Sequence, residues 1–373
     1  MVFLSYLVGC LVSKRWFLLL VLSFLALLGV FFRPFLLGVD AYASWSCVVY
    51  GWCDSLGWQQ GFVWFLELMP PVLFLAKLVM LCSLFLCVVA WFKILNLYFE
   101  ERVCWISVFF GFGLVPVIVF EFSKFENELL AFPLFFWGLY FLLKKFSVKN
   151  LFFGFGLWFV SLFFWLWLGI FFNSSWITFF LNGSVSSIVE LQFFSGFFSL
   201  FFGLLVLPLV FFVKNKKLWF FFVVFLLGLF LSGKLVVFLV PFCMIGIAKI
   251  VELLDEKKYN YDFLWVLVII MFFGLQLAVF VQQPSGYELV LVEDSVKMSV
   301  DENLSLKNDW SFGYWLWFYG YKTKNHPGNG VDSNFLEKPN ISLTSKDLSS
   351  LGCVRTGNEF STATRKMILW KCV

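Results

Sequence analysis

The chain has few charged residues and almost no histidine. Asp, Glu, Lys and Arg together make up only 13% of its 373 residues, and His326 is the single histidine. We find no Ser/His/Asp triad, no Walker loop and no Cys/His zinc pattern. No basic block interleaved with aromatic residues occurs in the C-terminal part, so we expect no nucleic-acid binding.

Apolar residues dominate instead. They make up 62% of the chain, and aromatic residues 23%, with 56 phenylalanines. No soluble domain needs that much apolar surface, so the composition predicts a polytopic α-helical membrane protein. A membrane-spanning helix needs about 20 apolar residues. We predict nine such helices, at residues 16–32, 71–95, 103–121, 128–143, 151–172, 193–213, 218–232, 235–248 and 263–281.

Lysine and arginine predict the orientation of these helices. With residue 1 inside, the inner segments hold Lys14, Arg15, Lys93, Arg102, Lys144, Lys145, Lys149, Lys214, Lys216, Lys217, Lys249, Lys257 and Lys258. The outer segments before residue 282 hold only Arg33, Lys124 and Lys234. Because basic residues concentrate on the cytoplasmic side, we predict a multi-pass protein of the cytoplasmic membrane with its N-terminus inside and its C-terminal tail outside.

Two domains are expected. Residues 1–281 form the transmembrane domain, with outer loops at 33–70, 122–127 and 173–192. Residues 282–373 are polar and predict a small extracytoplasmic α+β domain, with a strand suggested by the alternation in residues 287–292.

The nine cysteines fall into two groups. Five lie in apolar segments, where we expect them to pack as small hydrophobic residues: Cys10, Cys82, Cys87, Cys104 and Cys243. Cys47 and Cys53 share one loop, and Cys353 and Cys372 lie near the C-terminus. Each of these pairs can form a disulfide if its segment faces an oxidising compartment, and the sequence leaves this open.

Four acidic residues on the predicted outer side are candidate metal ligands: Asp40, Glu126, Glu128 and Glu190. Clustered carboxylates at a membrane face repel one another and lose hydration. A divalent cation such as Mg²⁺ or Mn²⁺ relieves both effects, because hard cations prefer oxygen ligands.

Each acid also has a simpler explanation. Glu126 and Glu128 open a predicted helix, where acids complement the helix dipole. Ser187 and Glu190 have the spacing of a capping box. Asp40 is explained more simply as an ordinary loop carboxylate.

In chain order, four segments resemble motifs of one enzyme family. They are Val39-Asp40-Ala41-Tyr42, Phe125–Ala131 with its Glu126-Asn127-Glu128, Ser187–Gln192 with its Ser-x-x-Glu, and Asp309–Trp315, whose likeness continues to Thr323. The family is the catalytic subunit of oligosaccharyltransferase, including its single-subunit archaeal and bacterial forms, within the C-type membrane glycosyltransferases. The chain has fewer predicted spans than that family, and Ser311 stands where the family has an acceptor-binding Asp.

The resemblance implies transfer of a glycan from a polyprenyl phosphate or diphosphate carrier to a protein or peptide acceptor outside the membrane. The four acids are the implied catalytic residues and would hold Mn²⁺ or Mg²⁺, with Asp40 also contacting the nucleophile. Lys234 would pair with the donor phosphate, although snorkelling to lipid headgroups explains it too. The implied acceptor groove comprises Trp310, Ser311, Tyr314 and Trp315; the rings of Trp310, Tyr314 and Trp315 could equally pack the core of the small domain.

Three other functions remain open. One is a glycosyltransferase that uses a polyprenyl-phosphate monosaccharide and modifies a lipid or protein hydroxyl. Another is a non-catalytic membrane assembly protein. A transporter is favoured least, because Lys77 is the one plausible polar residue within the spans.

Overall fold

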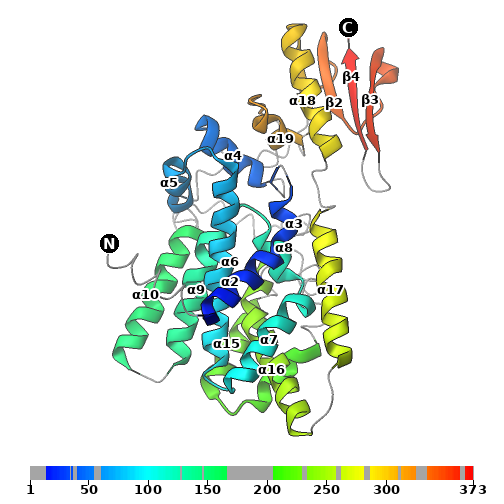
Figure 1. The fold of residues 1–373 in the computed structure, drawn as a ribbon. Helices are drawn as coiled ribbons and strands as arrows, with labels where there is room; N and C mark the ends of the chain where they lie inside the picture. The colour runs from blue at the N-terminus through cyan, green and yellow to red at the C-terminus, as the bar shows by residue number, and fades with distance from the viewer. Residues whose placement is uncertain are drawn as a thin grey trace. The chain divides into compact units, whose positions relative to one another are not determined.

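The computed structural model describes residues 14–33, 35–36, 40–53, 60–126, 128–144, 147–165, 205–228, 233–257, 262–280, 286–309, 312–324, 334–361 and 366–372. The described chain is mostly helical, with a small sheet near the C-terminus (Figure 1). It divides into two compact units. The first comprises residues 1–34, 58–62 and 73–280, and the second comprises residues 35–57, 63–72 and 281–373.

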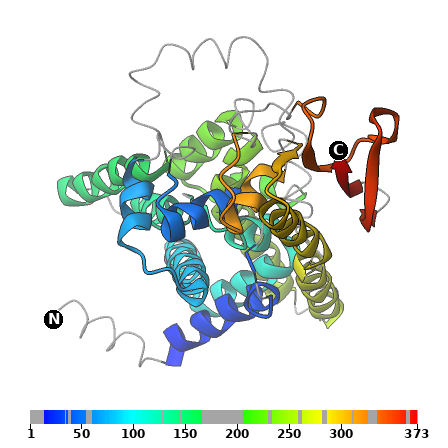
Figure 2. The same cartoon turned by 90° about the horizontal axis from the view of Figure 1, so that it is seen from above.

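The first unit is mainly helical in its described residues. Its elements are α2 (Lys14–Ala26), α3 (Leu28–Phe31), α6 (Leu73–Leu95), α7 (Glu101–Leu114), α8 (Val117–Phe122), α9 (Glu128–Leu143), α10 (Val148–Trp165), η4 (Leu207–Phe212), α15 (Lys216–Gly228), η5 (Gly233–Leu239), α16 (Val240–Glu256) and α17 (Asp262–Phe280). Helix α6 packs against α2, α7, α9 and α16. Figure 2 shows this packing with the cyan α6 viewed nearly along its axis.

The described helices follow the predicted apolar runs, but they do not support nine membrane-crossing helices. Two segments are long and apolar enough to cross a membrane, Leu73–Leu95 and Val236–Glu256. Other described apolar helices are shorter. The predicted span 103–121 is divided into α7 and α8 at Val115–Pro116, because proline cannot donate a helical hydrogen bond. Most of the predicted span 193–213 lies outside the described residues.

Close packing of α9 on α10 depends on two glycines. A Cβ atom on Gly138 would lie 2.3 Å from the ring of Trp158 and 2.9 Å from the carbonyl oxygen of Gly154. Small residues at such positions allow two helix backbones to approach closely. The Trp158 indole then donates to the Phe135 carbonyl at 3.0 Å, and the Ser161 hydroxyl to the Ala131 carbonyl at 2.9 Å.

The second unit contains a four-stranded sheet. Its strands are β1 (Ser305–Asn308), β2 (Asn340–Thr344), β3 (Cys353–Ser361) and β4 (Lys366–Cys372), in the order β1-β2-β4-β3. Strands β1 and β2 are parallel, and the other neighbours are antiparallel. Outside the sheet lie α4 (Asp40–Tyr50), α18 (Gly286–Asp301), α19 (Gly313–Phe318) and the short η7 (Ser349–Leu351), and the unit also includes most of α5 (Gln60–Leu68). Helix α18 packs beside the sheet and contacts all four strands (Figure 1).

The prediction of a strand at residues 287–292 is wrong, because these residues form the start of α18. An alternation over only six residues fits both the two-residue period of a strand and the 3.6-residue period of a helix. Burial continues at Leu289, Val292, Ser295 and Ser299, which are spaced three or four residues apart. That spacing places one face of a helix against the sheet, and no six-residue window reveals it.

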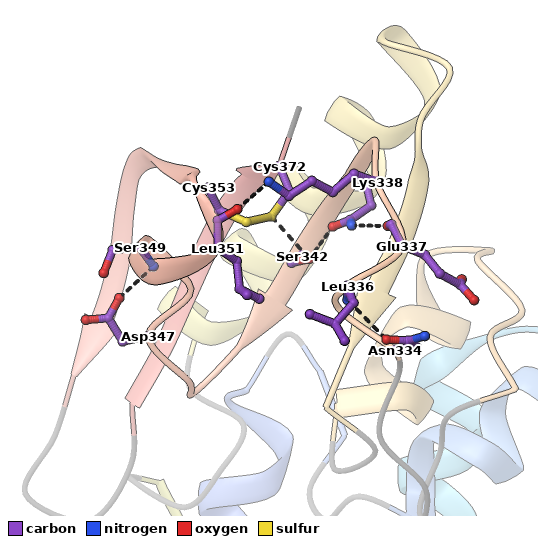
Figure 3. Close-up of a disulfide and its surroundings, with 11 residues drawn as sticks. Asn334, Leu336, Glu337, Lys338, Ser342, Asp347, Ser349, Leu351, Cys353 and Cys372 are labelled. Carbon is purple, nitrogen blue, oxygen red and sulfur yellow. Dashed lines mark hydrogen bonds between the residues drawn. A yellow bond between two sulfur atoms is a disulfide. The ribbon is translucent and has the colours of Figure 1, made fainter.

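Both cysteine pairs left open by the sequence are disulfides, and both lie in the second unit. Cys353 and Cys372 are directly opposite each other on β3 and β4, with Cα atoms 4.2 Å apart. Figure 3 shows this disulfide near the Lys338 side chain, which donates to the Leu351 carbonyl. The described cysteines of the first unit are all free thiols: Cys82, Cys87, Cys104 and Cys243.

Candidate functional site

Glu126 lies in the turn between α8 and α9, two residues before Glu128, which begins α9. Phe125 is fully buried, and its ring centroid is 6.2 Å from that of Phe62. Glu126 is half-buried, and its carbonyl accepts a hydrogen bond from the Leu129 amide at 3.2 Å. The buried phenylalanine therefore anchors a turn whose acidic residues sit at the start of an apolar helix.

Glu128 is the first residue of α9 and is only 8% exposed. The Ser83 hydroxyl of α6 donates to the Leu129 carbonyl at 2.5 Å, which ties α6 to the first turn of α9. The N-terminal end of a helix carries partial positive charge, so it stabilises a buried carboxylate there. This position suits the dipole explanation, and it also presents an anionic oxygen ligand.

Two buried cations lie in the same unit and were not selected from the sequence as site residues. Arg33 is 4% exposed and Lys77 is 5% exposed. The Lys77 ammonium donates to the Phe31 carbonyl at 3.3 Å and to the Arg33 carbonyl. It thereby holds the end of α3 against α6. The sequence feature that could have identified Lys77 is its position as a lysine inside an apolar run.

The cations and the acidic turn belong to the same end of the α6–α9 pair. Lys77 precedes Ser83 by six residues, which is roughly 9 Å along a helix at 1.5 Å per residue. Ser83 in turn contacts Leu129, next to Glu128. Lys77 and the first turn of α9 are thus both connected to α6, through Lys77 itself and through Ser83.

The remaining predicted metal ligands are described less completely. Asp40 is the first residue of α4 in the second unit, but its side chain lies outside the described residues. Glu190 lies outside them entirely. In the part of the chain that the structure describes, no three His, Cys, Asp or Glu side chains are grouped to hold a metal. The metal site stays a prediction.

The donor and acceptor residues are also only partly described. Lys234 is in η5, without a described side chain, and Trp310 and Ser311 fall outside the described ranges. Tyr314 and Trp315 are buried in α19, at 4% and 0% exposed. Trp315 stacks on Phe312 with centroids 5.8 Å apart. This burial suits the core-packing alternative, and the acceptor groove stays a prediction.

The first and fourth motif segments meet within the second unit. The ring of Tyr42, in α4, lies edge-on to that of Phe318, in α19, with centroids 5.1 Å apart. The Tyr50 hydroxyl donates to the Phe318 carbonyl at 3.2 Å across 268 residues of sequence. At the end of α4, Trp52 is edge-on to Trp317 at 6.1 Å. The segment that begins with Asp40 is thus packed on the segment that carries Tyr314 and Trp315.

Asp309 has a structural role that the sequence did not indicate. Its carboxylate is buried and accepts hydrogen bonds from the Thr344 hydroxyl at 2.7 Å, the Ser345 amide at 2.7 Å and the Ser345 hydroxyl at 2.9 Å. These bonds join the end of β1 to the end of β2.

In the same segment, burial raises the pKa of Tyr319 to about 12, so its hydroxyl stays protonated at neutral pH.

Comparison of the chain with protein-family models, curated proteins and solved structures found no match.

Proposed function

We propose that the chain is a membrane glycosyltransferase that resembles oligosaccharyltransferase. It transfers a glycan from a polyprenyl phosphate or diphosphate carrier to protein asparagine on the outer face of the membrane. The packing of α4 on α19 is the observation that carries this proposal. Two segments selected for their likeness to an outer acidic motif and to an acceptor motif lie far apart in the sequence, yet they contact each other.

In this proposal Glu126, Glu128, Asp40 and Glu190 would hold Mn²⁺ or Mg²⁺, which when bound would supply positive charge for the leaving phosphate. Arg33 and Lys77 join Lys234 as candidates for contacting the donor phosphate, because both are buried cations and Lys77 is on α6, the helix whose Ser83 binds the first turn of α9. Asp40 orients the acceptor amide.

The proposal includes the C-type glycosyltransferase fold and a multi-pass orientation in the cytoplasmic membrane, with the tail outside. The two apolar helices Leu73–Leu95 and Val236–Glu256 support membrane insertion. The distribution of cysteines supports the orientation, because both disulfides belong to the second unit and the described free thiols to the first. Disulfides persist in oxidising compartments.

Transfer is tested with the purified full-length protein, a lipid-linked glycan, a labelled Asn-x-Thr peptide and either Mn²⁺ or a chelator. Glu126→Gln and Glu128→Gln are expected to reduce transfer on the order of 100-fold, because each removes an anionic metal ligand. The matched control is Glu121→Gln, since Glu121 is in the same segment and pairs with Lys124 at 3.5 Å.

Two results contradict the proposal. One is absence of transfer from every polyprenyl donor in the presence of either metal. The other is equal activity in Glu121→Gln, Glu126→Gln and Glu128→Gln, which removes the metal-ligand role.

A hydroxyl acceptor is the second candidate. Burial of Tyr314 and Trp315 favours it, because a peptide has little of these rings to contact. The same assay distinguishes it when a polyprenyl-phosphate monosaccharide and a lipid or serine acceptor replace the glycan and peptide. Transfer to neither acceptor favours the non-catalytic assembly protein.

A further inference from the structure

Lysines surround an open cavity in the first unit. The cavity has a volume of about 430 Å³ and lies where the turn after α6, the end of α9 and the start of α15 meet. Its lining includes Lys144, Lys214, Lys216, Lys217, Asn215 and Tyr98. None of the described residues that line it is acidic. The four lysines are exposed, and Lys217 donates to the Lys144 carbonyl at 3.5 Å, so their charges give the cavity a positive potential that attracts anions.

The start of α15 adds positive potential to this cavity. Asn215 caps the helix, because its side-chain oxygen accepts the Leu218 amide at 3.0 Å. Lys216 and Lys217 follow in the first turn, which contains no acid. Cations are unfavourable at a helix N-terminus, where the dipole favours anions. A bound anion would compensate both the lysines and the helix end.

Tyr98 supplies an independent indication of a missing polar partner. Its hydroxyl is buried and forms no hydrogen bond with the described residues. A buried hydroxyl without a partner is unfavourable. Burial also raises the pKa of this phenol, so it remains a proton donor.

We propose that this cavity binds the phosphate group of an anionic ligand. The lysines neutralise its charge, and the first turn of α15 and the Tyr98 hydroxyl are available as further donors. Phosphate suits the site because its several oxygens accept hydrogen bonds from several lysines at once. The apolar helices α9 and α15 flank the cavity, so an anionic phospholipid can place its headgroup here and its chains along them.

The experiment measures ligand binding to the full-length protein in nonionic detergent. The probes are dihexanoyl phosphatidic acid, dihexanoyl phosphatidylcholine and inorganic phosphate. Wild-type protein is expected to bind phosphatidic acid more tightly than phosphatidylcholine, with affinity that falls as salt rises. Equal strength with inorganic phosphate identifies free phosphate as a sufficient ligand. Preference for phosphatidic acid identifies a lipid headgroup.

The pocket variant is Lys214→Gln/Lys216→Gln, and the control is Lys149→Gln/Lys257→Gln, which removes the same charge from two exposed lysines outside the cavity lining. Loss of two phosphate contacts is expected to weaken binding on the order of 30-fold. The control is expected to bind like wild type. Equal affinities in the two double variants overturn the proposal, and so does equal binding of the anionic and zwitterionic lipids.

A second variant covers the case in which the double substitution disturbs folding. Tyr98→Phe removes a buried hydroxyl that has no described partner, so it is expected to leave the melting temperature unchanged or raise it. It should weaken phosphatidic acid binding roughly fivefold through loss of one hydrogen bond. Unchanged binding in Tyr98→Phe together with unchanged binding in a folded pocket variant excludes the site.

Discussion

Replacement of Asp309 by alanine is expected to destabilise the second unit strongly. Its carboxylate accepts three hydrogen bonds, from the Thr344 hydroxyl and from the amide and hydroxyl of Ser345. Thr344 is fully buried, so water cannot replace its bond, whereas Ser345 is exposed and can be rehydrated. A hydrogen bond to a charged group contributes about 1.5–3 kcal/mol. Full loss of the Thr344 bond and partial loss of the two Ser345 bonds should together destabilise the unit by about 3 kcal/mol.

That loss should lower the unfolding temperature of this unit by roughly 10 °C. The assay heats the full-length protein in steps and measures the fraction of the C-terminal segment that resists protease. The control is Asp347→Ala, because Asp347 is exposed and binds Ser349 two residues away, whose amide donates to it at 2.9 Å. Asp309→Ala/Thr344→Val should be no less stable than Asp309→Ala, because the two residues share one bond.

The reasoning is refuted if Asp309→Ala and Asp347→Ala lose protease resistance at the same temperature. Equal and additive losses from Asp309→Ala and Thr344→Val would also contradict it, because they would show that the two side chains act independently.

Three further predictions concern individual contacts. Cys353→Ser/Cys372→Ser removes a disulfide with a sequence separation of 19 and should cost about 3 kcal/mol in unfolding free energy, measured by chemical denaturation against wild type with its disulfides intact. Gly246→Ala should lower the melting temperature in detergent and Gly274→Ala should not, because a Cβ would lie 2.2 Å from a backbone oxygen at the first site and meet nothing within 4 Å at the second. The hydrogen bond and charge of Lys307 lower the pKa of Glu337. This ion pair should therefore stabilise the fold above about pH 4.5 and lose its effect as pH falls through the lowered pKa. Glu337→Gln should then differ from wild type in protease resistance at neutral pH but not in strong acid.

The sequence alone indicated where several of the described apolar helices lie. The span predicted at 128–143 coincides with α9 at both ends, because an apolar run bounded by Glu128 and Lys144 is a local signal. Composition likewise indicated a helical chain with a small mixed domain at its end. The number of crossing helices could not be obtained in this way, because Pro116 and short runs divide helices without greatly changing the mean hydropathy.

Only the tertiary structure decided which distant residues meet. The packing of Tyr42 on Phe318, the carbonyl contacts of Lys77 and the bonds of Asp309 to the end of β2 all join segments separated by long stretches of chain. The helix at residues 287–292 and the pairing of the disulfide cysteines also depended on what surrounds them. Periodicity reports how one segment divides its apolar and polar faces, whereas partners are selected by complementary shape, hydrogen bonding and charge across the whole fold.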